Sequence, residues 1–220
     1  MTVRKNSVDE TQKALNASLE WTEVIGMSCN TTKYKQLCMA KEGVTPNFPP
    51  LFGIEQSDSF TLLGVTLQND CKFSSHVKGK LREANKCLYI LRSQRKDGYT
   101  HVEIDHLFKA IVLPRITYAL PVYEASEVDL NTIQCFLKRC NKRRYTSELI
   151  NIYDLLEKCD RSLFIKIKNN VNHPLYAFLP KVKESSKRLR SQASQLQRIN
   201  TERLKNCYFN RIRFQYNLAI

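Results

Sequence analysis

The sequence has no apolar run long enough to cross a membrane, and its first residues show no signal-peptide pattern. None of its eight cysteines forms a Cys-x2-Cys pair or has a histidine at zinc-finger spacing. These absences argue against a membrane protein, a secreted disulfide scaffold and a zinc finger. We expect reduced thiols, mostly small buried hydrophobes, in an intracellular protein of the cytoplasm, the nucleus or both. We expect no metal site and no membrane partner.

Acidic residues are also scarce. The 220 residues contain 21 Asp and Glu against 35 Lys and Arg, which gives a formal net charge of +14. Such an excess predicts a polyanionic partner, most often nucleic acid and less often an anionic membrane surface. The basic C-terminal stretch lacks the interleaved apolar face that a membrane-surface helix needs, so nucleic acid is favoured. The alternative is a lysine-rich surface that is merely solvated.

The first 70 residues predict one helix and short strands. Asp9 to Val24 has a helical pattern, with Ser7 and Glu10 as a capping box. Apolar and β-branched residues predict a strand from Gln36 to Ala40. Phe60–Leu67 reads as one short buried strand with Gly64 in its interior, and Leu51–Glu55 is expected to pair with it as a hairpin.

The rest of the chain is predicted to be helical. The expected helices run from Ser74 to Lys96, from Thr100 to a kink or end near Pro114, from Asp129 to Lys142 and from Ile152 to about Asn170. Thr100 with Glu103 predicts a second capping box, and Gly98 a helix stop. Beyond Pro180 the chain is polar and basic. We expect a flexible tail that buries no core, with at most a short helix near Glu202–Arg213.

Several motifs, in order along the chain, resemble the reverse transcriptases of non-LTR (LINE-type, jockey-like) retrotransposons. The matching residues of the first two motifs are Trp21, Met27, Asn30, Lys33 and Lys35, then Leu62, Leu63, Gly64, Val65, Leu67, His76, Ala84, Leu88 and Leu91. The most specific match comprises Pro114, Tyr118, Ala119, Pro121, Val122 and Tyr123. The resemblance extends from about Leu15 to the end of the chain.

The resemblance implies an α+β fold that is mostly α. Residues 1–72 would be a small antiparallel palm remnant of one helix and short strands, with a primer-grip strand at its end. Residues 73–145 would be a helical thumb, 146–180 a further helical segment and 181–220 a basic, flexible extension. In such polymerases the thumb lies along the duplex of template and primer, so the implied partners are RNA–DNA hybrid, DNA duplex or RNA. The oligomeric state is left open.

Catalytic carboxylates are missing. A polymerase needs paired carboxylates that hold two Mg²⁺ ions, and this sequence contains no Asp-Asp. The match begins just after that motif would occur, so Mg²⁺ is expected only for a full-length enzyme and no cofactor for this chain. Lys33 corresponds to a lysine proposed to assist pyrophosphate release, but without the rest of the active site we expect it only to hold the loop or contact a phosphate. The chain alone is predicted to be inactive.

The candidate nucleic-acid-binding residues are mostly cations. They are Lys33, Lys35, Leu63, Gly64, Val65, Lys78, Lys80, Arg82, Lys86, Arg139, Lys142, Arg143 and Arg144. The sequence therefore predicts a fragment of an RNA-directed DNA polymerase that retains its template–primer grip. Two alternatives stay open: a non-catalytic nucleic-acid-binding helical module, and a relic reading frame without a selected role.

Overall fold

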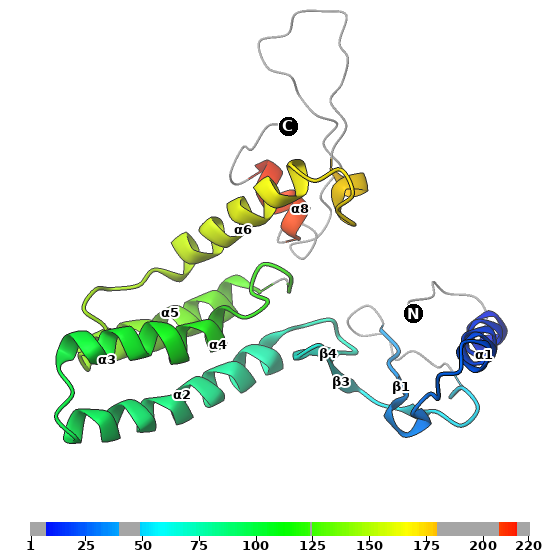
Figure 1. The fold of residues 1–220 in the computed structure, drawn as a ribbon, viewed down its shortest axis with the longest axis horizontal. Coiled ribbons are helices and arrows are strands. Elements are labelled where there is room, and N and C mark those ends of the chain that lie inside the picture. The colour runs from blue at the N-terminus through cyan, green and yellow to red at the C-terminus, as the bar shows by residue number, and fades with distance from the viewer. Residues whose placement is uncertain (1–7, 40–48, 124, 180–206, 215–220) are drawn as a thin grey trace, which may run out of the picture. The chain divides into compact units, whose positions relative to one another are not determined.

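The computed structural model describes residues 8–39, 49–123, 125–179 and 207–214. The fold is α+β and mostly α, with 60% helix and 7% strand. The chain forms two compact units, Met1–Lys72 and Phe73–Ile220, and Figure 1 shows their elements. Among the described residues no helix is both long and apolar enough to cross a membrane.

The first unit opens with helix α1, Val8–Val24, as predicted. Gly26 ends it with φ +73, a conformation that favours glycine, and the Met27 amide donates back to the Thr22 carbonyl at 2.8 Å. The expected cap residue Ser7 lies outside the described residues. A single 3-10 turn follows, η1, Thr31–Lys33, and the side chain of Asn30 caps it by accepting from the Thr32 amide.

The strands of this unit differ from the prediction. The expected single strand Phe60–Leu67 is wrong: β3, Ser59–Leu62, and β4, Val65–Gln68, form an antiparallel hairpin. Leu63 and Gly64 have φ of +48 and +77, so they form the two-residue turn that such hairpins use. Gly64 thus serves a reversal of the chain and does not sit inside a strand, and neither strand contains a buried residue.

The second pairing is parallel. β1, Lys35–Gln36, pairs with β2, Glu55–Gln56, so the predicted antiparallel pairing of Leu51–Glu55 with the later strand is wrong. Of the strand expected from Gln36 to Ala40, only Gln36 lies in β1, and Ala40 lies outside the described residues. A parallel pair needs a long crossover connection, which local sequence periodicity does not reveal.

The first unit buries little apolar surface. Among its described residues only Leu51 is a buried hydrophobic residue, whereas Trp21 is 62% exposed and Phe52 92% exposed. Burial of apolar side chains is the main favourable term in folding. The described part of this unit therefore has little apolar burial to stabilise it.

The second unit is organised on helix α2, Ser74–Lys96, whose bounds match the prediction. Val77, Ala84, Leu88 and Leu91 are buried on its inner face. Gly98, with φ +99, ends the helix as expected. In Figure 1 the next helices run back alongside α2, and their packing on α2 forms the core of the unit.

Three consecutive helical segments follow without a break: α3, His101–Leu107, the π-turn η2, Phe108–Val112, and α4, Leu113–Thr117. The capping box of Thr100 and Glu103 is confirmed. The predicted end of the helix near Pro114 is wrong, because the helix continues to Thr117; the alternative, a kink at this proline, stays a prediction. The wider π-turn, closed by the Leu113 amide on the Phe108 carbonyl, sits just before the proline. Proline cannot donate in the helical ladder, and the altered bonding of this turn accommodates it.

Helix α5, Glu127–Lys142, starts two residues earlier than expected, because Ser126 and Asp129 form a capping box that the sequence reading missed. Helix α6, Ile152–Lys168, and the 3-10 turn η3, Tyr176–Phe178, complete the central part. All eight cysteines are unpaired, but only Cys87 and Cys140 are buried. The expectation of mostly buried thiols is therefore wrong.

The C-terminal region is not wholly a solvated tail. Helix α8, Tyr208–Phe214, packs on α6, and Tyr208 and Ile212 join Phe164 and Ile167 in a buried apolar cluster. The prediction of a segment unable to bury a core is thus wrong for these residues. The expected short helix is present, and the predicted flexibility of 181–206 lies outside the described residues.

Candidate nucleic-acid interface

The basic residues of α2 lie away from its buried face, as the helical pattern predicts. Lys78, Arg82 and Lys86 are exposed. Lys80 is partly covered: its ammonium lies 5.5 Å from the ring centre of Tyr118 and 3.4 Å from a carboxylate oxygen of Glu83. Three of the four predicted cations of this helix are thus open to a partner, and Lys80 is engaged within the protein.

The C-terminal ends of α2 and α5 are joined by two arginines and one tyrosine. Arg95 donates to the backbone carbonyls of Arg143 and Arg144 at 3.2 and 2.7 Å, and its guanidinium lies 4.8 Å from the ring centre of Tyr145. Arg92 donates to the hydroxyl of the buried Tyr145 at 2.8 Å. A cation on these carbonyls also offsets the negative end of the α5 dipole. The join holds the C-terminal ends of two basic helices together.

Arg144 occupies a backbone position that glycine usually takes. The amide of Tyr145 donates to the Cys140 carbonyl, and that of Arg144 to the Asn141 carbonyl, which is the helix-ending arrangement called the Schellman motif. Arg144 has φ +57, a left-handed conformation that costs a non-glycine residue roughly 1–2 kcal/mol. Gly98 fills the same position at the end of α2. The chain thus keeps a cation at a strained position.

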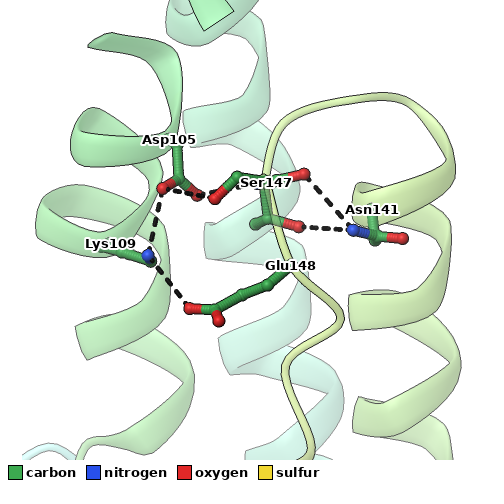
Figure 2. A network of polar contacts seen from close by, with 6 residues as sticks. Asp105, Lys109, Asn141, Ser147 and Glu148 are labelled. Atoms are coloured by element: carbon green, nitrogen blue, oxygen red, sulfur yellow. Dashed lines mark hydrogen bonds and ion pairs between the residues drawn. The ribbon is translucent and has the colours of Figure 1, made fainter. Parts of the chain in front are cut away.

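A polar network holds the segment that follows α5. Figure 2 shows Asp105 of α3 between Ser147 and Lys109. Its carboxylate accepts from the Ser147 amide and hydroxyl at 3.1 and 2.9 Å and lies 3.0 Å from the Lys109 ammonium, which is also 3.2 Å from Glu148. Asn141 donates to the carbonyl and hydroxyl oxygens of Thr146. These bonds fix the backbone just beyond Arg144.

Asp105 remains ionised despite its burial. Burial alone raises the pKa of its carboxyl, but the bonds from the Ser147 amide, the Lys109 ammonium and the Ser147 hydroxyl outweigh it, so the pKa lies below its ordinary value. His101 and His106 of the same helix are exposed, whereas Asp105 is only 5% exposed.

The result is a dense group of positive charges, which we call the basic cluster. Its members are Arg92, Arg95 and Lys96 of α2, with Lys138, Arg139, Lys142, Arg143 and Arg144 of α5 and its cap. Arg139 lies 5.5 Å from the ring centre of Phe136. Within the described part of the chain none of these eight residues forms an ion pair with a carboxylate. Unneutralised cations held this closely favour a polyanionic partner.

The other predicted binding residues belong to the first unit. Lys33 is exposed on η1, and Lys35 lies 3.9 Å from Glu55 of the paired strand β2. Leu63, at 84% exposed, and Gly64 form the hairpin turn, and Val65 opens β4 half-buried. The turn makes a small projecting apolar tip. Lys33 has no carboxylate partner among the described residues, and it is the capped turn that positions it.

Two motif residues are internal. His76 is 2% exposed, and its ring meets that of the buried Tyr123 edge-on at 4.8 Å. Burial, with a smaller effect of Lys80, lowers the pKa of His76, so its ring is neutral at pH 7. Tyr118, by contrast, is 48% exposed. The Pro114–Tyr123 segment is therefore mainly a packing corner, with a tight turn at Ala119, φ +56.

One residue of the predicted basic tail, Arg211, is buried and so is not available to a partner. Arg211 donates from Nε to Asp160 Oδ2 at 2.9 Å and from Nη2 to Asp160 Oδ1 at 3.1 Å and to the Pro121 carbonyl at 2.9 Å. Arg211 is 4% exposed and Asp160 is fully buried. The sequence reading missed this pair. The available signal was Asp160 itself, a carboxylate on the apolar face of α6.

Neither the metal-ligating residue types nor similarity to other proteins assigns a chemical reaction to the chain. The sequence has no adjacent aspartates, and the described residues contain no group of three His, Cys, Asp or Glu that could hold a metal ion. The sequence matches no family model, and comparison with the curated proteins and with the solved structures finds no similar protein. The retrotransposon resemblance therefore rests on the sequence motifs alone.

Proposed function

We propose that this chain is the C-terminal part of a non-LTR reverse transcriptase and that its own activity is to grip nucleic acid without catalysis. The proposed partners are RNA–DNA hybrid, DNA duplex or RNA, bound through phosphates and without sequence preference. The motifs that run from Trp21 to Tyr123 support the family, and the basic surface of the second unit supports the activity. The proposed site of action is the cytoplasm, the nucleus or both.

The observation that carries the proposal is the basic cluster. Its cations are gathered by structure as well as by sequence, since Arg92 and Arg95 fasten two helix ends and Arg144 takes a strained position that glycine would fill without steric strain. Strained backbone persists where the surrounding structure enforces it, and it is concentrated at functional sites. A surface needed only for solubility would not require this arrangement.

Catalysis is not proposed for the chain itself. Primer extension by the two-metal route needs a pair of carboxylates, and the sequence offers no adjacent aspartates to hold Mg²⁺. We expect the purified chain to show no primer extension with Mg²⁺. Measurable extension would contradict this part of the proposal.

The binding test compares two triple variants of equal charge. K138A/K142A/R143A removes exposed cations of the basic cluster, and K158A/K166A/K168A removes exposed cations of α6. Affinity for a DNA duplex is measured by fluorescence anisotropy across a salt series. We expect the first variant to bind more weakly and with a salt slope smaller by about 0.9 for each lost phosphate contact. The α6 variant should behave like the parent chain.

Equal losses in the two variants would mean that net charge alone, and not the basic cluster, carries binding. Affinity that barely changes with salt would contradict a phosphate-based grip altogether. The relic alternative is favoured by one feature, the scarcity of buried apolar residues in the described part of the first unit. Its test is the unfolding of that unit.

A further inference from the structure

The exposed face of α2 carries an aromatic side chain among its cations. Lys78, Arg82 and Lys86 are spaced by four residues, so they are about 6 Å apart along the helix axis and about 40° apart around it. Tyr89 falls inside the arc of about 80° that these three residues span. We call Lys78, Arg82, Lys86 and Tyr89 the α2 stripe. The only acidic residue of α2, Glu83, lies outside this arc and is paired with Lys80.

Tyr89 differs from the other tyrosines of the second unit. It is 76% exposed, the highest value for any tyrosine that the structure describes. Tyr123 is buried in the core, Tyr145 holds Arg92 and Arg95, and Tyr118 lies under Lys80. Tyr89 has no such contact within the described residues. Its ring therefore presents an open π face on the same side of α2 as the three cations, three residues beyond Lys86.

We propose that the α2 stripe binds single-stranded nucleic acid, with Tyr89 stacking on an unpaired base while Lys78, Arg82 and Lys86 contact phosphates. A single strand offers both an anionic backbone and free base faces, and cations interleaved with aromatic rings are the surface that fits it. In a duplex the base faces are already stacked on one another, so the ring of Tyr89 would have no partner there. This inference rests on the proposed function and narrows its partner to nucleic acid with unpaired bases.

The test measures affinity of the full chain for a mixed-sequence single strand and for a fully paired, blunt-ended duplex with the same number of phosphates. Stacking is worth at least about 1 kcal/mol per base, so Y89A should lose about fivefold or more in affinity for the single strand. Its affinity for the duplex should stay within about twofold of the parent value. Y89F keeps the ring and should bind both ligands like the parent chain.

Two matched variants separate charge from stacking. K86A removes a cation of the same stripe and should weaken both ligands to a similar extent. Y176A removes an exposed tyrosine from η3 and should change neither. Because Tyr89 is exposed, its truncation leaves the core intact, and the thermal unfolding of Y89A should match that of the parent chain.

The outcomes are distinct. If K86A weakens binding while Y89A changes nothing, or if Y89A weakens the two ligands equally, the stacking inference is overturned and the phosphate grip stands. If the parent chain binds neither ligand at low salt, the proposed function fails and this inference fails with it. A W21F/Y89W chain gives a direct readout, since its single indole should be quenched by the single strand and not by the duplex. Equal quenching by both would also overturn the inference.

Discussion

At the residue scale, replacement of Arg144 by glycine should change stability and nucleic-acid binding in opposite directions. Replacement by glycine relieves the left-handed backbone strain of about 1–2 kcal/mol and costs about 0.5–1 kcal/mol through the freer unfolded chain. We expect R144G to raise the free energy of unfolding by roughly 0.5–1 kcal/mol. The same change removes one cation of the basic cluster, so the salt slope of nucleic-acid binding should fall by about 1. Urea unfolding and salt-dependent anisotropy measure the two effects.

The control for Arg144 is R144A, which removes the charge but keeps a side chain at φ +57. It should weaken binding as R144G does and give no gain in stability. If R144G bound nucleic acid like the parent chain, Arg144 would have no role in the basic cluster, and its strained position would need another explanation.

Asp105 makes a stability contribution that depends on pH. Its folded-state pKa lies below the ordinary value of 3.8, so its contribution is present above that value and is lost as the pH falls through the folded-state pKa. We expect the parent chain to lose more unfolding free energy than D105N between pH 6 and pH 3. Urea unfolding at the two pH values measures this difference.

E148Q is the matched change for this comparison, because the Glu148 side chain is 70% exposed and its ion pair with Lys109 lies in solvent. It should unfold like the parent chain at both pH values. A D105N variant with the same pH dependence as the parent chain would mean that the network of Figure 2 contributes nothing specific to stability.

At the element scale, α8 is fastened to α6 by the buried pair of Arg211 and Asp160. Removing one partner leaves an uncompensated buried charge, which typically costs about 3–5 kcal/mol. We expect R211M to lower the free energy of unfolding by an amount in this range, and D160L/R211M to recover a large part of it. Urea unfolding of the full chain measures both variants.

R161A provides the comparison, since Arg161 is an exposed arginine of α6, the helix that carries Asp160, and it pairs with Glu157 at 2.7 Å. An exposed pair of this kind is worth about 0–1 kcal/mol. If R211M cost no more than R161A, then α8 would contribute little to the stability of the second unit.

The elements that the sequence predicted well are those defined by local signals. Helix α2 follows from the spacing of Val77, Ala84, Leu88 and Leu91, and its end follows from Gly98. The hairpin turn at Leu63–Gly64 was misread because an apolar residue preceding the glycine resembles strand interior. The parallel pairing of β1 with β2 depends on partners distant in sequence. Periodicity alone does not report such pairings.

In the candidate site, too, local signals could be read from the sequence, whereas contacts between residues distant in sequence could not. Local composition indicated the cations of the basic cluster, but not which of them are engaged. The role of Arg95 depends on carbonyls of Arg143 and Arg144, some 48 residues away. Arg211 looked like one more solvated cation because its partner Asp160 lies 51 residues earlier. Charge density is a property of sequence, whereas the availability of each charge is a property of the fold.

At the scale of the whole molecule, the two units differ in what can hold them together. The second unit has a core that includes Phe108, Ile133 and Leu137, all nearly fully buried. The first unit has Leu51 as its only buried hydrophobic residue in the described part. Ordering the backbone costs about 1–2 kcal/mol per residue, which apolar burial must offset. The second unit has the burial to do so, and the first has little.

We therefore expect the full chain to unfold in transitions that do not coincide. Trp21 is the only tryptophan and lies in α1, 62% exposed, so its fluorescence reports the first unit. Circular dichroism at the helical wavelength is dominated by the long helices of the second unit. The Trp21 signal should change at lower urea than the circular dichroism, or barely change at all. Coincident transitions would show that both units unfold as one cooperative structure. That result would argue against the relic alternative, because a first unit without stabilising burial of its own would then be held in a selected fold.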